Sequence, residues 1–191
     1  GLDGGRAVPI NVGGRLAGRV GAFSLGVLQI QTDDVPASGV PDTNFSVVRL
    51  KRDLLRRSSI GALFTRRSES TRGPGSNDTF GLDGTFGFYD NLSINTYWAK
   101  TRTSGLQDEI SYRAQLDYNG DRYGVRAEHL VVGTDFNPEV GFLRRDDFEQ
   151  SGGSFRFSPR PRSIAAIRKL SWEGRFDYLT DRAGVVETRQ A

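Results

Sequence analysis

The chain alternates apolar and polar residues in short runs that are separated by turn-forming residues. One run places Ile110, Tyr112, Ala114, Leu116 and Tyr118 at every second position, with Ser111, Arg113, Gln115 and Asp117 between them. Successive side chains of a strand point to opposite faces, so this alternation predicts a sheet with one apolar and one polar face. The same pattern recurs at 10–20 and 170–178. The polar positions carry full charges, which is typical of a barrel with lipid outside and water inside.

The alternation and the turns together predict about ten strands. We place them at 9–20, 23–32, 44–53, 59–67, 78–89, 92–101, 108–118, 122–132, 148–158 and 169–179. Each is close to the roughly 9–11 residues with which a tilted strand crosses a bilayer. The predicted fold class is therefore all-β: an antiparallel up-and-down meander over residues 1–191, forming a transmembrane β-barrel or part of one.

The predicted connections alternate between short and long. The short ones are Gly21-Ala22, 54–58, Asp90-Asn91 and Asn119-Gly120-Asp121, and the long ones are 33–43, 68–77, 102–107 and 133–147. Asn-Gly indicates a tight hairpin in which both residues adopt positive φ. Short turns on one side and long loops on the other are typical of bacterial outer-membrane barrels, whose short turns are periplasmic. Residues 158–169, with two prolines and four basic residues, are predicted to be a longer periplasmic turn.

Composition excludes several classes of site. The absence of cysteine rules out disulfides, thiolate zinc sites and cysteine nucleophiles, and the single histidine, His129, argues against histidine-based metal or triad chemistry. With 26 basic and 23 acidic residues, the charge is not that of a nucleic-acid-binding protein. We expect no cofactor and no metal. The chain starts without Met and ends in Arg189-Gln190-Ala191, so we interpret it as a piece of a longer protein.

Four stretches resemble one family. They are NFSVVRLKRDLLRRSSIG (44–61), FGFYDNLSINTYWAKT (86–101), YRAQLDYNGDRYGVRAEHLVVGTDFNPEVGFLRR (112–145) and FRFSPRPRSIAAIRKL (155–170). They are similar to the bacterial outer-membrane β-barrel domain of unknown function that follows a family-9-like carbohydrate-binding module, and the linked pair DYNGDRYG and FNPEVGF is the most specific part. The resemblance implies an outer-membrane barrel domain whose upstream sugar-binding module is absent from this sequence. It also implies that further strands complete the barrel if the family's barrel is larger.

Two sets of residues are candidates for function. The charged positions of the alternating strands are predicted to line a lumen and set solute selectivity, or else to form a solvated face with weak ion pairs. They are Arg15, Arg19, Arg49, Lys51, Asp83, Arg113, Asp117, Arg126, Glu128, Glu173, Arg175 and Asp177. In the longest loop, Asn137, Pro138, Glu139 and Phe142 are candidates for a constriction, and the loop either folds inward or caps the pore.

Other patterns favour structural interpretations. Asp117 to Glu128 has the spacing of a calcium loop, but Arg122 replaces the required glycine, so a hairpin is favoured. Asp146, Asp147 and Glu149 suggest a charged loop tip rather than a glycosidase dyad. His129 is predicted on the apolar face near a strand end. Aromatic residues are predicted to form interfacial girdles: Tyr89, Tyr97, Trp98, Tyr118, Tyr123, Trp172 and Tyr178.

The predicted function is a non-catalytic barrel of the bacterial outer membrane, acting as a channel or surface scaffold linked to glycan binding or uptake. The predicted partners are outer-membrane lipid, a glycan or small polar solute, and other chains that complete the barrel; nucleic acid is not expected. Period-two alternation alone does not tell which face is inside, so a soluble β-barrel that binds a small apolar ligand is one alternative. A component of a glycan-processing enzyme is the other.

Overall fold

The alternating runs form strands, and the strands form one sheet. The computed structural model describes residues 2–3, 6–107, 109–161 and 168–190. Its sheet contains β3 (Ile10–Val20), β4 (Phe23–Thr32), β5 (Thr43–Leu55), β6 (Ser58–Arg67), β7 (Asn77–Phe88), β8 (Leu92–Thr103), β9 (Glu109–Asn119), β10 (Tyr123–Val132), β11 (Phe148–Phe157), β12 (Trp172–Thr180) and β13 (Val186–Gln190). Two short strands, β1 (Leu2–Asp3) and β2 (Arg6–Ala7), pair with each other, and Pro36–Ser38 forms a single turn of 3-10 helix, η1.

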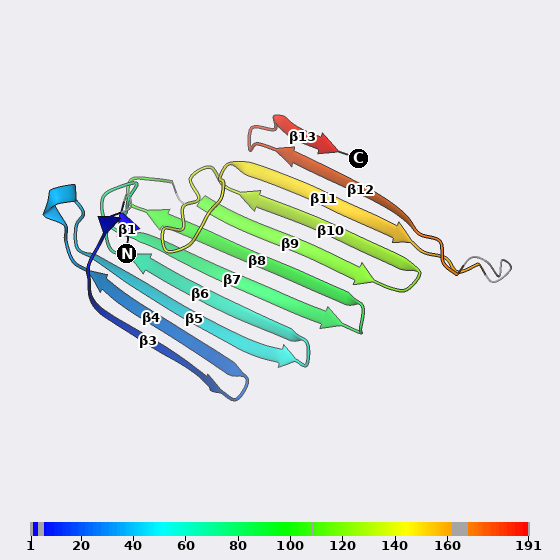
Figure 1. Cartoon of the computed structure of the whole chain (residues 1–191), viewed down its shortest axis with the longest axis horizontal. Helices are drawn as coiled ribbons and strands as arrows, with labels where there is room; N and C mark the ends of the chain where they lie inside the picture. The colour runs from blue at the N-terminus through cyan, green and yellow to red at the C-terminus, as the bar shows by residue number, and fades with distance from the viewer. Residues whose placement is uncertain (1, 4–5, 108, 162–167, 191) are drawn as a thin grey trace.

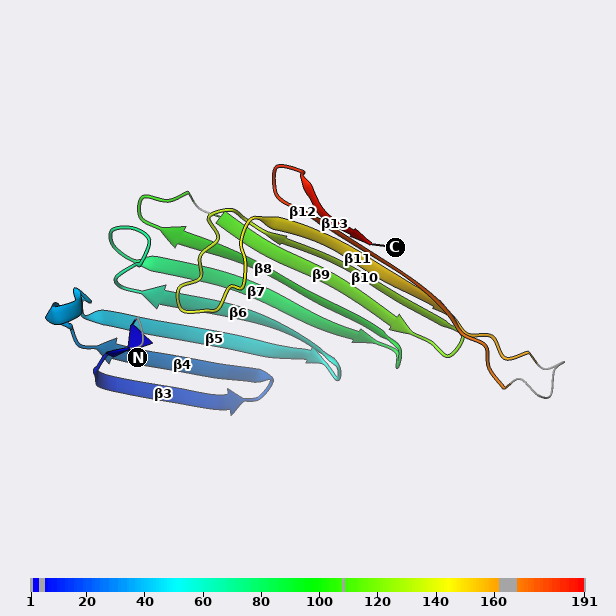
Figure 2. The same cartoon turned by 45° about the horizontal axis from the view of Figure 1, so that its top comes forward.

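Each strand of the sheet pairs antiparallel with its neighbours in the sequence, from β3 at one edge to β13 at the other. This confirms the predicted up-and-down meander. Figures 1 and 2 show the result as a single twisted layer with β3 and β13 at its opposite edges. In the described part of the chain these two strands are not paired with each other, so the sheet is open.

The ten predicted strands are all present in the sheet, which contains one further strand that the sequence did not predict; the short strands β1 and β2 were not predicted either. The missed strand is β13, with the sequence VETRQ, which lacks apolar alternation and pairs with β12 over a register shift. In β3 the register shifts between Ile10 and Val12, so the predicted strict alternation stops there.

The connections lie at two ends of the sheet. The connections after β3, β5, β7, β9 and β11 lie at one end, here called the short-turn end, and the others lie at the long-loop end (Figure 1). The predicted Asn119-Gly120 turn is wrong in detail: Asn119 ends β9, and neither residue has positive φ. Of the predicted turn at 158–169, the described residues 158–161 and 168–169 connect β11 to β12 at the short-turn end, and residues 162–167 lie outside the described part.

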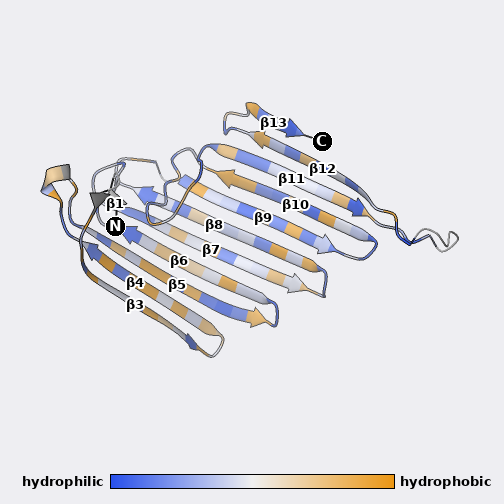
Figure 3. Ribbon diagram, in the orientation of Figure 1, coloured by the Kyte–Doolittle hydropathy of each residue, from blue (hydrophilic) through white to orange (hydrophobic). Residues whose placement is uncertain are grey.

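The sheet has almost no hydrophobic core. Among the described residues only Val131, Val132 and Phe136 are buried apolar side chains. Figure 3 shows hydrophobic and hydrophilic residues succeeding one another along the strands. No described helix is long and apolar enough to span a membrane. Because an unlayered sheet leaves both faces uncovered, the chemistry of those two faces decides what the molecule can contact.

Candidate functional site: a charged face and an apolar face

All twelve predicted lumen residues lie on one face of the sheet, here called the charged face. The strand register aligns Lys51, Gly61, Asp83, Tyr97 and Arg113 in one cross-strand row, and residues two apart along a strand share that face. The remaining predicted residues fall on the same side by the same register. The prediction that these charges share a face is therefore confirmed, and their role in selectivity stays a prediction.

Strands β9 and β10 carry a connected polar network on the charged face. Asp117 and Arg126 are directly opposite in the register and form an ion pair of 2.6 Å. Arg113 contacts Glu128 at 2.7 Å and donates to Gln115 at 2.6 Å, and Gln115 donates to Asp117 at 2.5 Å. The residues that mimic a calcium loop thus form a hairpin, as predicted. The described residues contain no cluster of His, Cys, Asp and Glu suited to a metal ion.

The charges of β12 face this network across small residues of β11. Asp177 is opposite Gly152, and Arg175 is opposite Ser154. A Cβ atom on Gly152 would lie 2.8 Å from Oδ1 of Asp177, so the carboxylate occupies the space that a side chain would take. The result is a polar hollow of about 220 Å3, lined by Arg126, Glu128, Gln150, Gly152, Gly153, Ser154, Arg175 and Asp177. Both signs of charge line it, which suits a polar, hydrated solute better than an apolar one.

A second ion pair on the charged face depends on a glycine. The guanidinium of Arg49 on β5 reaches over β6 and binds the carboxylate of Asp83 on β7 in a bidentate manner. A Cβ atom on Gly61 would lie 2.5 Å from Arg49, so only glycine leaves this path open. Arg19 pairs with Asp53 at 2.7 Å nearer the short-turn end. Sequence reasoning named Arg49 and Asp83 but missed Gly61, whose only indication was a glycine inside an otherwise regular strand.

The longest loop, 133–147, folds onto the charged face at the long-loop end. Asn77, which is fully buried, donates from Nδ2 to Oγ1 of Thr103 at 2.7 Å and to the carbonyl of Asn137 at 2.8 Å. Its Oδ1 accepts from the backbone N–H of Glu139 at 3.2 Å. The backbone N–H of Asn137 donates to Oγ1 of Thr101 at 3.2 Å. The loop therefore lies over the charged face, and its role as a constriction stays a prediction.

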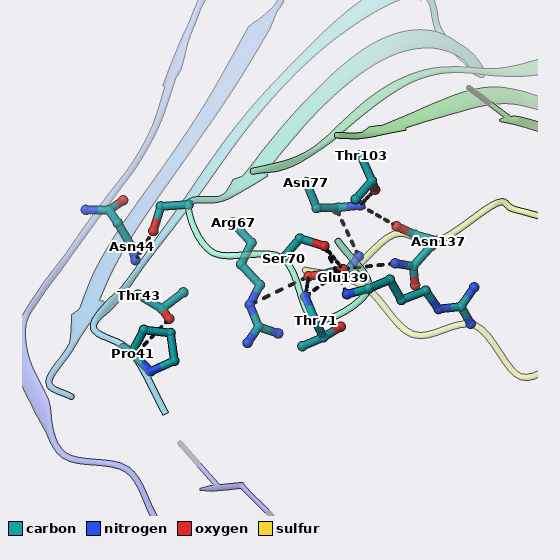
Figure 4. Close-up of polar contacts among 12 residues, drawn as sticks. Pro41, Thr43, Asn44, Arg67, Ser70, Thr71, Asn77, Thr103, Asn137 and Glu139 are labelled. Atoms are coloured by element: carbon teal, nitrogen blue, oxygen red, sulfur yellow. Dashed lines mark hydrogen bonds and ion pairs between the residues drawn. The ribbon is translucent and has the colours of Figure 1, made fainter. Parts of the chain in front are cut away.

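The Glu139 carboxylate fastens this loop to the neighbouring loop 68–76 (Figure 4). Its side chain is 3% exposed. It accepts from Oγ of Ser70 at 2.7 Å, from the backbone N–H of Thr71 at 3.0 and 3.1 Å, and from Nδ2 of Asn137 at 3.0 Å. The Arg67 guanidinium lies 3.7 Å away and balances the charge. We call these contacts the Glu139 anchor.

The other predicted constriction residues are peripheral to the anchor. The carbonyl of Pro138 accepts from the N–H of Gly141 in a turn, and Phe142 is 88% exposed. A hollow of about 380 Å3 lies beside this turn, lined by residues of 137–146 together with Arg67, Thr71 and Arg72. Further along the loop, Arg145 forms a bidentate ion pair with Glu187 of β13, and this hydrogen-bonded carboxylate raises the pKa of Arg145 above its ordinary value.

The acidic residues at and just after the end of the loop contact separate partners. Asp146 lies 3.7 Å from Arg72, Asp147 accepts from Thr134 at 2.9 Å, and Glu149 lies 3.9 Å from Nε2 of His129. The predicted loop tip is therefore wrong in position: the N–H of Asp147 donates to the carbonyl of Gly133 at the base of the loop, and Glu149 lies in β11.

The opposite face of the sheet is apolar over its middle. Many large side chains on it are exposed: Leu16, Leu25, Leu50, Ile60, Phe80, Leu82, Trp98, Leu116, Val125, Phe155 and Phe176. In β3 to β12 its charged residues lie towards the strand ends, with Arg52 near the short-turn end and Arg66, Asp78, Lys100, Arg102 and Glu149 near the long-loop end. We call the surface between them the apolar band. His129 belongs to this face, as predicted, and its Nδ1 contacts Oγ of Ser151 at 2.9 Å.

The predicted aromatic girdle is only partly on this face. Tyr123, Trp172 and Tyr178 share the apolar face, as do Tyr118 and Trp98. Tyr97 was assigned wrongly, because the register puts it on the charged face, where its hydroxyl contacts Oγ of Ser111 at 3.0 Å. Tyr89 lies in the turn after β7 with a φ of 54° and is 87% exposed.

The chain was compared with protein families, curated proteins and solved structures, and no relative was found. No family model matches the chain, and neither a curated protein nor a solved structure is significantly similar to it. The relationship to the outer-membrane barrel domain that follows a sugar-binding module stays a prediction.

Proposed function

We propose that this sheet is part of the wall of a bacterial outer-membrane β-barrel, with the apolar band in lipid and the charged face lining a water-filled lumen. The observation that carries the proposal is the separation of the two faces. The ten strands β3 to β12 expose large apolar side chains on one face, while the twelve predicted lumen charges all lie on the other. Lipid would cover the apolar band, and water would solvate the charges.

The position of the charges on the apolar face supports the same orientation. Arg52 lies near one end of the band, and Arg66 and Asp78 pair at 3.7 Å near the other. A charge is costly at the middle of a bilayer and tolerated at its surfaces, so a lipid-facing sheet confines charges to the strand ends.

The open edges of the sheet imply that other strands complete the wall. A membrane-embedded sheet satisfies its backbone hydrogen bonds only when it closes, so β3 and β13 would pair with strands outside the described residues or in another chain. Within such a barrel, the loop held by the Glu139 anchor would narrow the lumen. The proposed activity is non-catalytic passage or display of a polar solute, and a link to glycans follows only from the resemblance described above.

A matched pair of single-cysteine variants tests the orientation, because the chain has no cysteine of its own. Ile94 and Asn95 are neighbours on β8, and the register puts Ile94 on the apolar face and Asn95 on the charged face. A spin label on I94C in native outer membranes is expected to collide with oxygen dissolved in lipid. A label on N95C is expected to collide with a water-soluble nickel complex.

Fractionation provides the accompanying measurement. The native protein is expected in the outer-membrane fraction, with heat-modifiable migration on gels after detergent extraction. Recovery in the soluble fraction, with the Ile94 label shielded from oxygen and from nickel, would contradict the proposal. It would favour the soluble barrel instead, in which the apolar hollow of about 570 Å3 beside Leu50, Leu82 and Trp98 would hold a small apolar ligand.

A further inference from the structure

The two ends of the sheet carry opposite charge. The difference lies in the described residues of the connections and in the two residues on either side of each connection. The short-turn end has eight basic and three acidic residues: Arg19, Arg56, Arg57, Arg122, Arg156, Arg160, Arg168 and Lys169 against Asp90, Asp121 and Glu173. The long-loop end has seven basic and thirteen acidic residues on the same count. The short-turn end therefore attracts anions, and the other end repels them.

Local ion pairs, such as Arg19 with Asp53 and Arg57 with Asp90, neutralise only part of this surplus. Asp121 forms ion pairs with both Arg160 at 2.7 Å and Lys169 at 4.0 Å, so one carboxylate is shared by two cations. Within the described residues, no carboxylate lies within ion-pair distance of Arg56, Arg122 or Arg168. All three of these side chains are exposed.

Stacked aromatic rings stand at the same end, on the apolar face. Tyr123, Phe157 and Trp172 are opposite one another in the register of β10, β11 and β12. Their rings stack, with centroids 5.3 Å apart between Tyr123 and Phe157 and 5.9 Å apart between Phe157 and Trp172. The Arg122 guanidinium lies 5.6 Å from the Tyr123 ring and 5.5 Å from the Phe157 ring. Arg52 lies likewise 5.1 Å from the ring of Phe23.

We propose that the short-turn end binds the headgroups of anionic phospholipids, with Arg122 at the centre of the contact. This inference rests on the proposed membrane location. Arg122 is held by aromatic rings at the rim of the apolar band, so its ligand must offer a negative charge directly beside apolar chains. An anionic phospholipid has that arrangement, with its phosphate at the level where Tyr and Trp rings sit in a membrane interface.

Tryptophan fluorescence can report lipid contact separately at the rim and in the middle of the band. The chain has two tryptophans, Trp98 in the middle of the apolar face and Trp172 at the short-turn end. In the W98F variant, Trp172 is the sole reporter, and in W172F it is Trp98. The full chain is reconstituted in vesicles of phosphatidylcholine and phosphatidylglycerol, in which either one or the other lipid carries bromine as a quencher.

Brominated phosphatidylglycerol is expected to quench Trp172 more than brominated phosphatidylcholine at equal mole fraction, and high salt should remove the difference. Substituting R122Q should lower the preference for phosphatidylglycerol roughly fivefold, because one basic side chain near an anionic surface is lost. The matched control is R182Q at the long-loop end, where Arg182 is also exposed. R182Q should leave the preference unchanged.

Equal quenching of Trp172 by the two lipids would overturn the proposal, as would a preference that persists in R122Q. An acidic protein would then be the better partner for these cations. The reporter at Trp98 separates this result from failure of the proposed function. If neither lipid quenches Trp98, the apolar band is not in lipid, and the membrane location itself is wrong.

Discussion

Removing the charge of Glu139 should release the longest loop from the charged face. The substitution E139Q keeps the size of the side chain but replaces an ionised acceptor that is 3% exposed. The amide cannot accept all the bonds now made by Ser70, Thr71 and Asn137. Arg67, whose Nε is buried without a hydrogen-bond partner, would also lose its counter-charge.

The expected cost to loop closure is about 2 kcal/mol, the order of a hydrogen-bonded charge that is lost from a partly buried site. This cost is at the lower end of the range for losing a hydrogen-bonded buried charge, because Thr71 is exposed and its backbone N–H can bind water when the loop opens. Such a change raises the open fraction of the loop about thirtyfold.

Limited trypsin digestion measures this opening, because Arg144 and Arg145 lie in the loop. When opening and closing are faster than cleavage, the initial rate follows the open fraction. E139Q should be cut at these two residues about thirtyfold faster than the parent chain. The matched control is E69Q, which removes an exposed carboxylate from the neighbouring loop. If E139Q and E69Q are cut at the same rate, the carboxylate does not hold the loop, and the reasoning from the anchor fails.

Two further outcomes follow from the charged face. G61A should push Arg49 from its path to Asp83 and lower the urea midpoint of unfolding. The control is G14A, whose added Cβ has no atom within 4 Å, and equal midpoints for the two variants would show that the ion pair adds no stability. D117N removes the carboxylate charge that faces Arg126 at 2.6 Å and should shift the reversal potential in planar bilayers towards anion selectivity. An unchanged potential would mean that these charges do not face the permeation path.

The strands could be predicted because their evidence is local. In β9, the apolar residues Ile110, Tyr112 and Ala114 alternate with polar residues such as Ser111 and Arg113. This alternation specifies both the strand and its two faces within a few residues. The VETRQ segment of β13 has no such alternation, and it is a strand because β12 offers an edge to pair with. The Asn119-Gly120 turn failed for a related reason: local turn preference yielded to the pairing of the strands on either side.

The sequence by itself determined the meander, the two faces of the sheet and the alternation of short and long connections, because each depends on residues that are close along the chain. Only the tertiary structure decided which distant residues meet. Arg49 finds Asp83 through the space above Gly61, and Glu139 reaches Ser70 and Arg67 across two loops. The charge difference between the two ends likewise depends on which turns are brought together. These contacts depend on strand register and packing, which no short stretch of sequence specifies.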